Sequence, residues 1–371
     1  MRGQCLTTLT RLVILKTTLS DIGEMVSIDG QGGKTMKSRS MRFIQGAAAA
    51  STLVASAFAA IGSTATAASA AKPKMTIAFN VGAEADPFFI SMSIGAYAEA
   101  AKLGVNLIWS GNPSQYSPST QLPILEQLYS QKPNAIVIAP TDTKALAGIT
   151  SQFVKAGIPV VNVDSGNANQ SNISAWVTGF NYQGGQAAAD ALAKAINYST
   201  ACSSSSTCAV AVGVSSLTTS TDAARVKGFN DEVKAKFPNM KLLQAVVSQS
   251  SPATAQSGFE QDIAANNLVG IFAVDGTDAE GATAAVAAKG AVSTIKVVGY
   301  DAYKSNEDSL KAGTLAGIIS QQPQTEGMLA VLYAYKAALK QHVPHLTQLP
   351  NPVLTPSSSA ATLAKWVYAT A

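Results

Sequence analysis

Ala135-Ile-Val-Ile-Ala139 and Pro159-Val-Val-Asn-Val163 are two short apolar runs, and residues 141–156 between them read as a helix that ends at Gly157. Apolar runs without alternation are typical of strands that helices cover on both faces. A strand, a helix and a second strand in this order predict a right-handed βαβ unit in a parallel sheet. This unit decides the fold class, and its pattern continues in both directions along the chain.

The same alternation of strands and helices fills most of the sequence. Asp86 is a candidate N-cap, Pro87 suits the first turn of the helix that follows, and Gly104 suits its end. The other expected strands are 75–80, 105–109, 209–214, 241–247, 269–274, 294–299 and 315–320. The other expected helices are 87–103, 120–130, 185–197, 222–237, 254–265, 279–288 and 325–339. The pattern runs twice, with a break near Cys202 and Cys208, which predicts an α/β protein of two doubly wound parallel-sheet lobes.

Length and composition agree with two lobes. The chain has 371 residues, of which 47% are hydrophobic and 13% charged, and this is too long for one ordinary domain of roughly 100–200 residues. Seven Lys and Arg but only three Asp and Glu lie in residues 1–70, and the remainder carries nineteen of each. A balanced charge without a basic run argues against a nucleic-acid partner.

The first 70 residues have the features of an export signal. A basic stretch begins at Met36, an uncharged Ala-rich stretch follows over 44–61, and two Ala-x-Ala patterns lie at 65–70. This order predicts a leader and cleavable signal peptide over residues 1–70, with translation starting at Met36 or Met41. A membrane anchor and a genuine extension before Met36 are the alternatives. Export predicts a periplasmic location.

Two of the three cysteines flank a serine-rich loop. In an oxidising compartment we expect Cys202 and Cys208 to form a disulfide, and two free thiols in a mobile loop are the alternative. His342 and His345, the two histidines, lie far from both in sequence, so no zinc site is expected. The chain has no G-x-S-x-G, Walker A or dinucleotide-binding motif, and we therefore expect neither an enzyme nor a cofactor.

Polar and aromatic side chains follow the predicted strands at the sheet edge where ligands of open α/β folds bind. Carboxylates accept hydrogen bonds from hydroxyl groups, Arg donates, and aromatic rings cover C–H faces, so the set suits a neutral polyol. Each residue also has a structural interpretation, as a helix cap, a turn, a core ring or a surface ion pair. The candidates are Asp86, Phe88, Phe89, Asp164, Arg225, Asp275, Asp301 and Gln321.

Several segments resemble the type I periplasmic binding proteins of the ribose, galactose and xylose group. The resemblance covers about residues 75–350, and Arg225-Val-Lys-Gly-Phe229 and Ile319-Ser-Gln-Gln-Pro323 are two of its landmarks. Others are Asp86-Pro-Phe-Phe-Ile90, 95–104, 133–142, 157–164 and Val297-Val-Gly-Tyr-Asp301. The resemblance implies two lobes that close on one ligand, and it carries the eight candidates over as the ligand set.

The resemblance also implies a three-segment hinge with crossings near Gly179–Phe180, Gln321–Gln322 and residues 346–351. The expected N-terminal lobe is 72–179 plus 322–349, the expected C-terminal lobe is 180–321 plus 350–358, and 359–371 is a loose tail. The implied protein is a monomeric sugar-binding component of an ABC importer, whose permease subunits in the inner membrane are its partners. A receptor for chemotaxis or signalling and a binder of a non-sugar solute are the alternatives.

This chain departs from the ribose-binding pattern in its candidate pocket. Asp86 and Asp275 stand where ribose binders tend to have Asn, Ser165 stands where they tend to have Arg, and an aromatic residue near Ser251 is missing. These changes make the expected pocket more acidic. They leave open which sugar or polyol binds, and they keep a cationic ligand among the alternatives.

Overall fold

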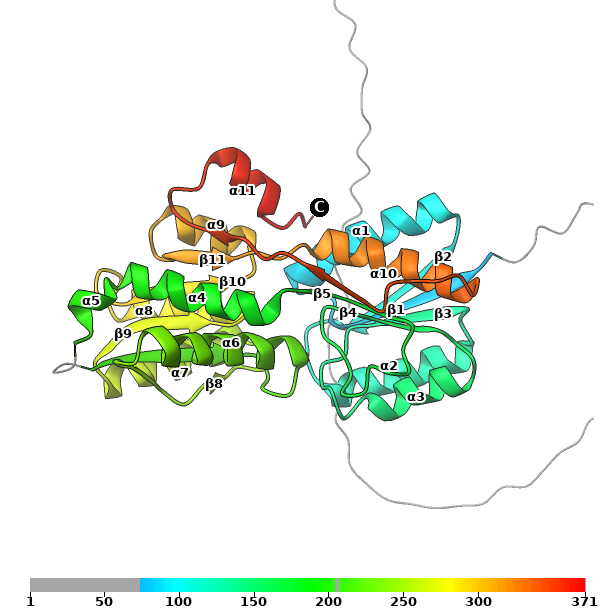
Figure 1. The fold of residues 1–371 in the computed structure, drawn as a ribbon, viewed down its shortest axis with the longest axis horizontal. Helices are drawn as coiled ribbons and strands as arrows, with labels where there is room; N and C mark the ends of the chain where they lie inside the picture. Colours follow the sequence, from blue (N-terminus) through cyan, green and yellow to red (C-terminus); the bar gives the residue numbers. More distant parts are fainter. Residues whose placement is uncertain (1–73, 204–206, 371) are drawn as a thin grey trace, which may run out of the picture. The chain divides into compact units, whose positions relative to one another are not determined.

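The protein is described by a computed structural model over residues 74–203 and 207–370. The predicted leader and signal peptide lie outside the described residues. Two sheets with helices on both faces form the two lobes, which confirms the predicted fold class (Figure 1). No helix of the described residues has the length and apolar character that crossing a membrane requires.

The N-terminal lobe is built on a six-stranded, fully parallel sheet in the order β12-β5-β4-β3-β1-β2. Ile77 and Phe79 pack under α1 and α10, while Ala78 between them packs under α2 and α3, as the two-residue period of a strand requires. The strands are β1 (Thr76–Ala83), β2 (Asn106–Asn112), β3 (Ala135–Ile138), β4 (Val160–Val163), β5 (Ala175–Gly179) and β12 (Leu346–Leu349). The helices are α1 (Pro87–Leu103), α2 (Pro118–Gln131), α3 (Ala147–Lys155) and α10 (Pro323–Ala338).

The C-terminal lobe has a sheet in the order β13-β11-β10-β9-β6-β7, and β8 also pairs with β6. Only β13 is antiparallel to its neighbour within the described part of this sheet. Helices α4 and α6 cover one face, and α7 and α8 pack on the other. The strands are β6 (Cys208–Val214), β7 (Met240–Leu242), β8 (Val246–Val247), β9 (Leu268–Ala273), β10 (Lys296–Tyr300), β11 (Gly317–Ile319) and β13 (Val353–Leu354). The helices are α4 (Asn181–Ala195), α5 (Tyr198–Ala201), α6 (Ser220–Lys236), α7 (Pro252–Ala265), α8 (Gly276–Ala288), α9 (Lys304–Lys311) and α11 (Ala360–Trp366).

The chain passes between the lobes three times. It leaves β5 at Gly179 for α4, leaves β11 at Ile319 for α10, and leaves β12 at Leu349 for β13. The last strand of each sheet therefore comes from the final part of the chain. These crossings place the loops after the strands of both lobes at a common boundary.

Two expected elements differ from the observed ones. The helix expected over 141–156 begins only at Ala147, because Asp142 Oδ1 accepts the backbone N–H groups of Lys144 and Ala145 in a turn. The single strand expected over 241–247 is divided into β7 and β8, which pair with different parts of β6.

The residues expected to be a loose tail are ordered, and this prediction was wrong. They form α11, in which the Ser359 side chain accepts the N–H of Thr362 as an N-cap, and the buried Tyr368 follows it. Strand β5 and helices α5 and α9 were also not predicted. Helices α5 and α9 are short and largely polar, and β5 is a five-residue strand whose apolar residues are interrupted, so no apolar period marks them.

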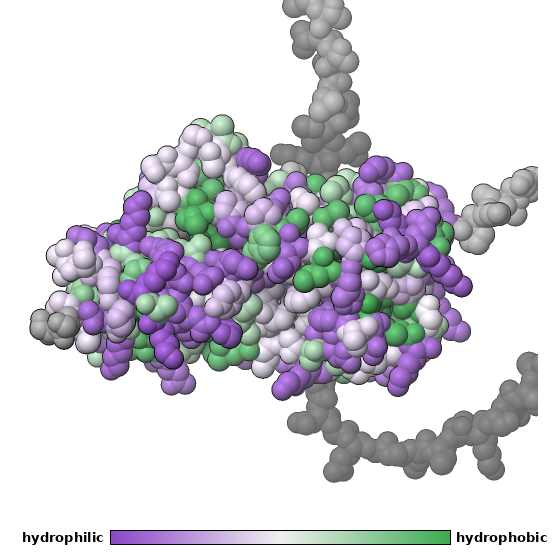
Figure 2. Space-filling view, viewed as in Figure 1, coloured by the Kyte–Doolittle hydropathy of each residue, from purple (hydrophilic) through white to green (hydrophobic). Residues whose placement is uncertain are grey.

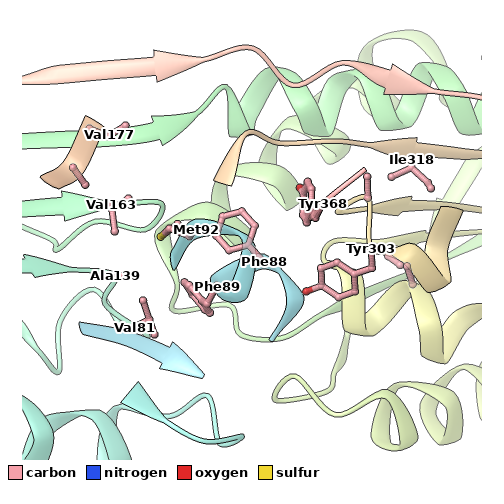
Figure 3. Packing of buried hydrophobic residues seen from close by; sticks show 14 of the residues in the cluster. Val81, Phe88, Phe89, Met92, Ala139, Val163, Val177, Tyr303, Ile318 and Tyr368 are labelled. Atoms are coloured by element: carbon pink, nitrogen blue, oxygen red, sulfur yellow. The ribbon is translucent and has the colours of Figure 1, made fainter. Parts of the chain in front are cut away.

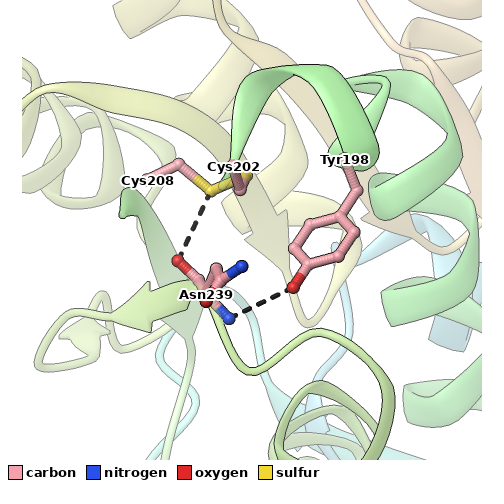
Figure 4. Close-up of a disulfide and its surroundings, with 4 residues drawn as sticks. All are labelled: Tyr198, Cys202, Cys208 and Asn239. Carbon is pink, nitrogen blue, oxygen red and sulfur yellow. Dashed lines mark hydrogen bonds between the residues drawn. A yellow bond between two sulfur atoms is a disulfide. The ribbon is translucent and has the colours of Figure 1, made fainter. Parts of the chain in front are cut away.

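Cys202 follows α5 and Cys208 begins β6, and the structure joins them in a disulfide with a Cα–Cα distance of 5.3 Å. Asn239 lies beside this bridge: its N–H donates to the Tyr198 hydroxyl over 3.1 Å, and its carbonyl oxygen lies 3.9 Å from Cys208 Sγ (Figure 4). The bridge thus ties the end of α5 to the first strand of the C-terminal lobe.

Hydrophilic residues cover most of the face over α4 and α6 (Figure 2). On this face Lys236 Nζ lies 3.2 Å from Asp190 Oδ1, and both side chains are about half exposed. His342 and His345 are also exposed. Neither histidine lines the cavity described below.

Candidate functional site

A cavity of about 40 Å³ lies where loops of the two lobes meet. The structure brings all eight candidate residues of the sequence to its wall. It adds six further residues at that wall: Tyr116, Ser215, Thr221, Asp222, Ser250 and Tyr303. Five of the fourteen lining side chains are carboxylic acids, and Arg225 is the one cationic side chain among them.

Asp86 begins α1 as its N-cap. Its Oδ1 accepts the N–H of Phe88 over 2.8 Å and the hydroxyl of Tyr303 over 2.5 Å. The second bond joins the two lobes, because Asp86 precedes α1 and Tyr303 precedes α9. The capping role is therefore real, and the same carboxylate also reaches the opposite lobe.

Phe88 and Phe89 lie in the first turn of α1, and both are buried. Their rings meet edge to face at a centroid distance of 5.3 Å, and the Phe88 ring lies 6.0 Å from that of Tyr368. Figure 3 shows both phenylalanines between strands of the N-terminal lobe and Tyr303 and Tyr368. The rings belong to the core and line the cavity at the same time.

Asp164 and Asp301 each follow a strand in a left-handed backbone conformation, with φ of 55° and 64°. This conformation is uncommon for residues other than Gly, although Asp and Asn tolerate it best. Asp301 is anchored by Gln321 Nε2 over 2.7 Å and by the hydroxyl of Tyr368 over 2.9 Å. Asp164 Oδ1 is buried and has no hydrogen-bond partner among the described residues.

Arg225 is held rigidly beneath the cavity. Its Nε donates to Asn181 Oδ1 over 2.8 Å and its Nη1 to the carbonyl of Val274 over 3.1 Å, while its guanidinium carbon lies 4.0 Å from the centroid of the Tyr300 ring. A Cβ at Gly185 would lie 2.0 Å from the carbonyl oxygen of Arg225, so glycine there permits the close approach of α4 and α6. The position of Arg225 thus depends on helix packing.

The guanidinium compensates the neighbouring acids only in part. Its nearest carboxylate oxygens belong to Asp164 and Asp222, each at 3.8 Å, which is beyond hydrogen-bond distance. Both of its hydrogen bonds described above go to neutral acceptors. The cavity therefore keeps a surplus of acidic groups.

Asp275 is the N-cap of α8 and a fully bonded carboxylate. Its oxygens accept the N–H and hydroxyl of Ser215, the hydroxyl of Thr277 and the N–H of Asp278. Burial acts to raise the pKa of Asp275, but the neighbouring Asp278 carboxyl group and these donors outweigh it and hold that pKa below the usual value. Asp275 is thus ionised at neutral pH.

Other acids of the cavity behave in the opposite way. Burial raises the pKa of Asp86 to about 7, although the hydrogen bonds from Tyr303 and Phe88 act to lower it. Burial also raises the pKa of Asp164 to about 7, against the nearby charge of Arg225. Burial and the Asp275 carboxylate raise the pKa of Asp222 well above its usual value. Asp86 and Asp164 therefore change between neutral and charged forms near neutral pH.

Tyr368 was missed because it lies in the segment expected to be loose. Its hydroxyl accepts the N–H of Gln321 over 2.9 Å and donates to Asp301 Oδ1. Tyr303 and Asp222 were also missed, although both lie about as close to a strand end as Phe88 and Arg225 do. Their burial in an otherwise polar segment is visible only in the structure.

Comparison with known proteins points to one family. The family model described as periplasmic binding protein domain matches residues 77–342. The ribose import binding protein RbsB of Escherichia coli (strain K12) is 29% identical over 290 residues, which cover 76% of this chain and 91% of that protein. RbsB of Bacillus subtilis (strain 168) is 29% identical over 265 residues, which cover 70% and 80% of the two chains.

Solved structures agree with this result. An ABC transporter solute-binding protein from Agrobacterium vitis, bound with α-D-tagatopyranose, is 31% identical with a TM-score of 0.74, and the match covers 80% of this chain and 100% of that one. A carbohydrate transporter solute-binding protein from Agrobacterium radiobacter, in complex with D-arabinose, is 27% identical with a TM-score of 0.74, and the match covers 79% and 99%. This chain therefore belongs to the periplasmic binding protein family.

Proposed function

We propose that this protein is the solute-binding component of an ABC importer and that it binds a monosaccharide or a related polyol in the cavity between its lobes. The observation that carries the proposal is the meeting of the eight candidate side chains from both lobes around one cavity. Relatives of known function bind ribose or other sugars. Acidic oxygens, one guanidinium and buried aromatic rings form a suitable surface for hydroxyl and C–H groups.

Opening of the lobes is part of the proposal. The cavity of about 40 Å³ is much smaller than the roughly 300–1,000 Å³ of typical ligand pockets. A sugar therefore enters when the lobes separate at the three crossings, and it is enclosed when they close. A ligand that touches both lobes shifts the equilibrium toward the closed form by its difference in affinity for the two forms.

The family and the leader composition support export to the periplasm, where the closed form would dock on the permease. We assign the binding role to Asp86, Phe88, Phe89, Asp164, Arg225, Asp275, Asp301 and Gln321. We also propose that the lobes divide near residues 179, 321 and 350, because the chain changes sheet at these places.

A binding screen tests the proposal. The purified protein is titrated by calorimetry and by thermal shift with pentoses, aldohexoses, ketohexoses and polyols. A bound ligand at a hundredfold excess over its dissociation constant stabilises the fold by about 2.7 kcal/mol. We expect saturable binding of one sugar class at a stoichiometry of one, and loss of that binding in Asp301→Ala. Binding that Asp301→Ala leaves unchanged would place the ligand elsewhere.

A further inference from the structure

The acceptor groups of the cavity outnumber its donors, and this imbalance bears on the ligand. Asp164 Oδ1 and Gln321 Oε1 are buried acceptor atoms without hydrogen-bond partners among the described residues, and both side chains line the cavity. Asp164 is 6% exposed and Gln321 is 3% exposed. A buried acceptor without a partner costs free energy that a donor from the ligand would recover.

Apart from Arg225, whose Nη2 group has no hydrogen-bond partner described above, several donors of the cavity wall are engaged already. The Gln321 side-chain amide donates to Asp301, the Tyr303 hydroxyl donates to Asp86, and the Ser215 hydroxyl donates to Asp275. A ligand that offers mainly donors is therefore complementary to this wall. Among small polar groups an ammonium offers three donors and no acceptor.

The charge of the cavity leads to the same ligand class. Asp86, Asp275 and Asp301 are bonded to neutral donors, and Arg225 lies 3.8 Å from Asp164 and from Asp222. One guanidinium thus faces five carboxyl groups in a buried space. A buried charge is costly unless an opposite charge accompanies it.

Resting on the proposed function, we propose that the ligand is a cationic polyol, namely a sugar or polyol that carries a protonated amine. Its ammonium group lies between Asp86 and Asp164, one from the entry of α1 and one from the end of β4, and its hydroxyl groups face Asp275, Asp301 and Arg225. The acidic replacements relative to the ribose-binding pattern then select against neutral sugars. A neutral sugar supplies no counter-charge, so it cannot stabilise the ionised forms of Asp86 and Asp164.

Opposite pH dependences separate a cationic ligand from a neutral sugar that accepts hydrogen bonds from the protonated acids, and the matched neutral ligands described below separate it from a sugar that donates to the ionised acids. Asp86 faces Tyr303, Asp301 and Asp275. Asp164 faces Arg225, Asp301, Glu326, Asp222 and Tyr116. A cation binds their ionised forms, so its affinity rises as the pH increases from 5.5 to 7.5. A neutral sugar that uses them as protonated donors loses affinity over the same range. The pH series uses the 1-amino-1-deoxy-alditols, whose primary alkyl amines, like Lys, stay protonated well above neutral pH.

The experiment compares amine ligands with matched neutral ligands, and it uses the full protein. Glucosamine, galactosamine, mannosamine and the 1-amino-1-deoxy-alditols are titrated by calorimetry beside their hydroxyl counterparts and, as uncharged nitrogen controls, their N-acetyl derivatives. At pH 7 we expect one amine to bind at least tenfold more tightly than both neutral partners. Its affinity should rise with pH between 5.5 and 7.5.

Two variants remove charge while keeping shape. In Asp86→Asn the remaining amide oxygen can still accept from Phe88 and Tyr303, and Asn is a good N-cap. Asp164→Asn changes a side chain whose Oδ1 has no partner. Each should weaken the amine at least tenfold more than it weakens the hydroxyl counterpart. Asp190→Asn, on the exposed face of α4, is the control and should change neither.

The outcomes distinguish this inference from the proposed function. A hydroxyl sugar that binds as tightly as its amine, with affinity that falls as pH rises, overturns the cationic ligand and leaves sugar binding intact. Equal weakening of amine and hydroxyl ligands by Asp86→Asn would also overturn it. If the folded protein binds none of the amines or neutral sugars, both the inference and the proposed function fail.

Discussion

At the scale of single residues, Arg225 has the largest number of different roles. It stacks on Tyr300, bonds to Asn181 and Val274, and provides the one positive side chain of the cavity wall. Its surroundings raise its pKa even though burial opposes the charge. Loss of this residue removes a hydrogen-bond donor for the ligand. It also removes the positive charge that lies beside Asp164 and Asp222.

We expect Arg225→Ala to weaken ligand binding by about 2–4 kcal/mol, since a buried charge-assisted contact is lost. Titration calorimetry with the ligand found in the screen measures the change. Lys227→Ala on the same helix is the control, because its side chain is 67% exposed and pairs with Asp231. An unchanged affinity in Arg225→Ala would remove this residue from the binding site.

Strand-end reasoning located eight residues of the cavity wall from the sequence, because parallel strands bring their carboxyl ends to one edge. It did not locate Asp222, Tyr303 or Tyr368, whose approach to the cavity depends on helix packing and on an ordered C-terminal segment. The left-handed backbone conformation of Asp164 and Asp301 could not be predicted from the sequence either, because an Asp residue does not by itself indicate a positive φ.

At the scale of elements, the periodic spacing of apolar residues along the sequence predicted the long helices and the buried strands well. It predicted α1 over its whole length and missed β5, in which the partly exposed Trp176 and the polar Thr178 interrupt the apolar run. It also missed α11, whose packing is made by few residues. Leu363 is buried, and Trp366 is only partly buried. Weakly patterned elements depend on tertiary contacts that no local window contains.

The segment after α11 supports the site through one hydroxyl. We expect Tyr368→Phe to lower ligand affinity by about 1–2 kcal/mol, because Asp301 and the N–H of Gln321 lose a buried partner. Calorimetry measures the change, and circular dichroism verifies the fold. Lys365→Ala in the same segment is the control, as Lys365 is exposed. Equal affinities in Tyr368→Phe and the unaltered protein would show that Asp301 needs no support from the tail.

The disulfide gives a prediction about the junction of α5 and β6. In the Cys5→Ser chain we expect no thiol to react with a thiol reagent in denaturant before reduction and two to react after it. Closing a loop of this size stabilises the fold by about 2 kcal/mol, so reduction should lower the midpoint of urea unfolding. Two reactive thiols without a reducing agent would contradict the bridge.

At the scale of the whole molecule, buried acids connect stability to pH. The pKa values of Asp86 and Asp164 rise to about 7 in the folded protein, whereas the unfolded chain has Asp values near ~4. Between these pH values the folded state holds more protons than the unfolded state. Stability is therefore highest below about pH 4 as far as these two groups are concerned, and it falls as the pH rises through 7.

We expect the free energy of unfolding to decrease by a few kcal/mol between pH 5 and pH 8 in the absence of ligand. Urea unfolding at a series of pH values measures it. Asp86→Asn and Asp164→Asn should each reduce the slope, because the amide does not titrate. Burial raises the pKa values of Asp222, Asp278 and Glu326 as well, so these groups act in the same direction. A stability that rises over this range would show that other groups dominate.

The order of synthesis follows from the position of the last strands. β12 completes the first sheet from Leu346–Leu349, and β13 completes the second from Val353–Leu354. Neither sheet can gain its final strand before the ribosome has made these residues. Until then both lobes of the emerging polypeptide lack part of their sheet.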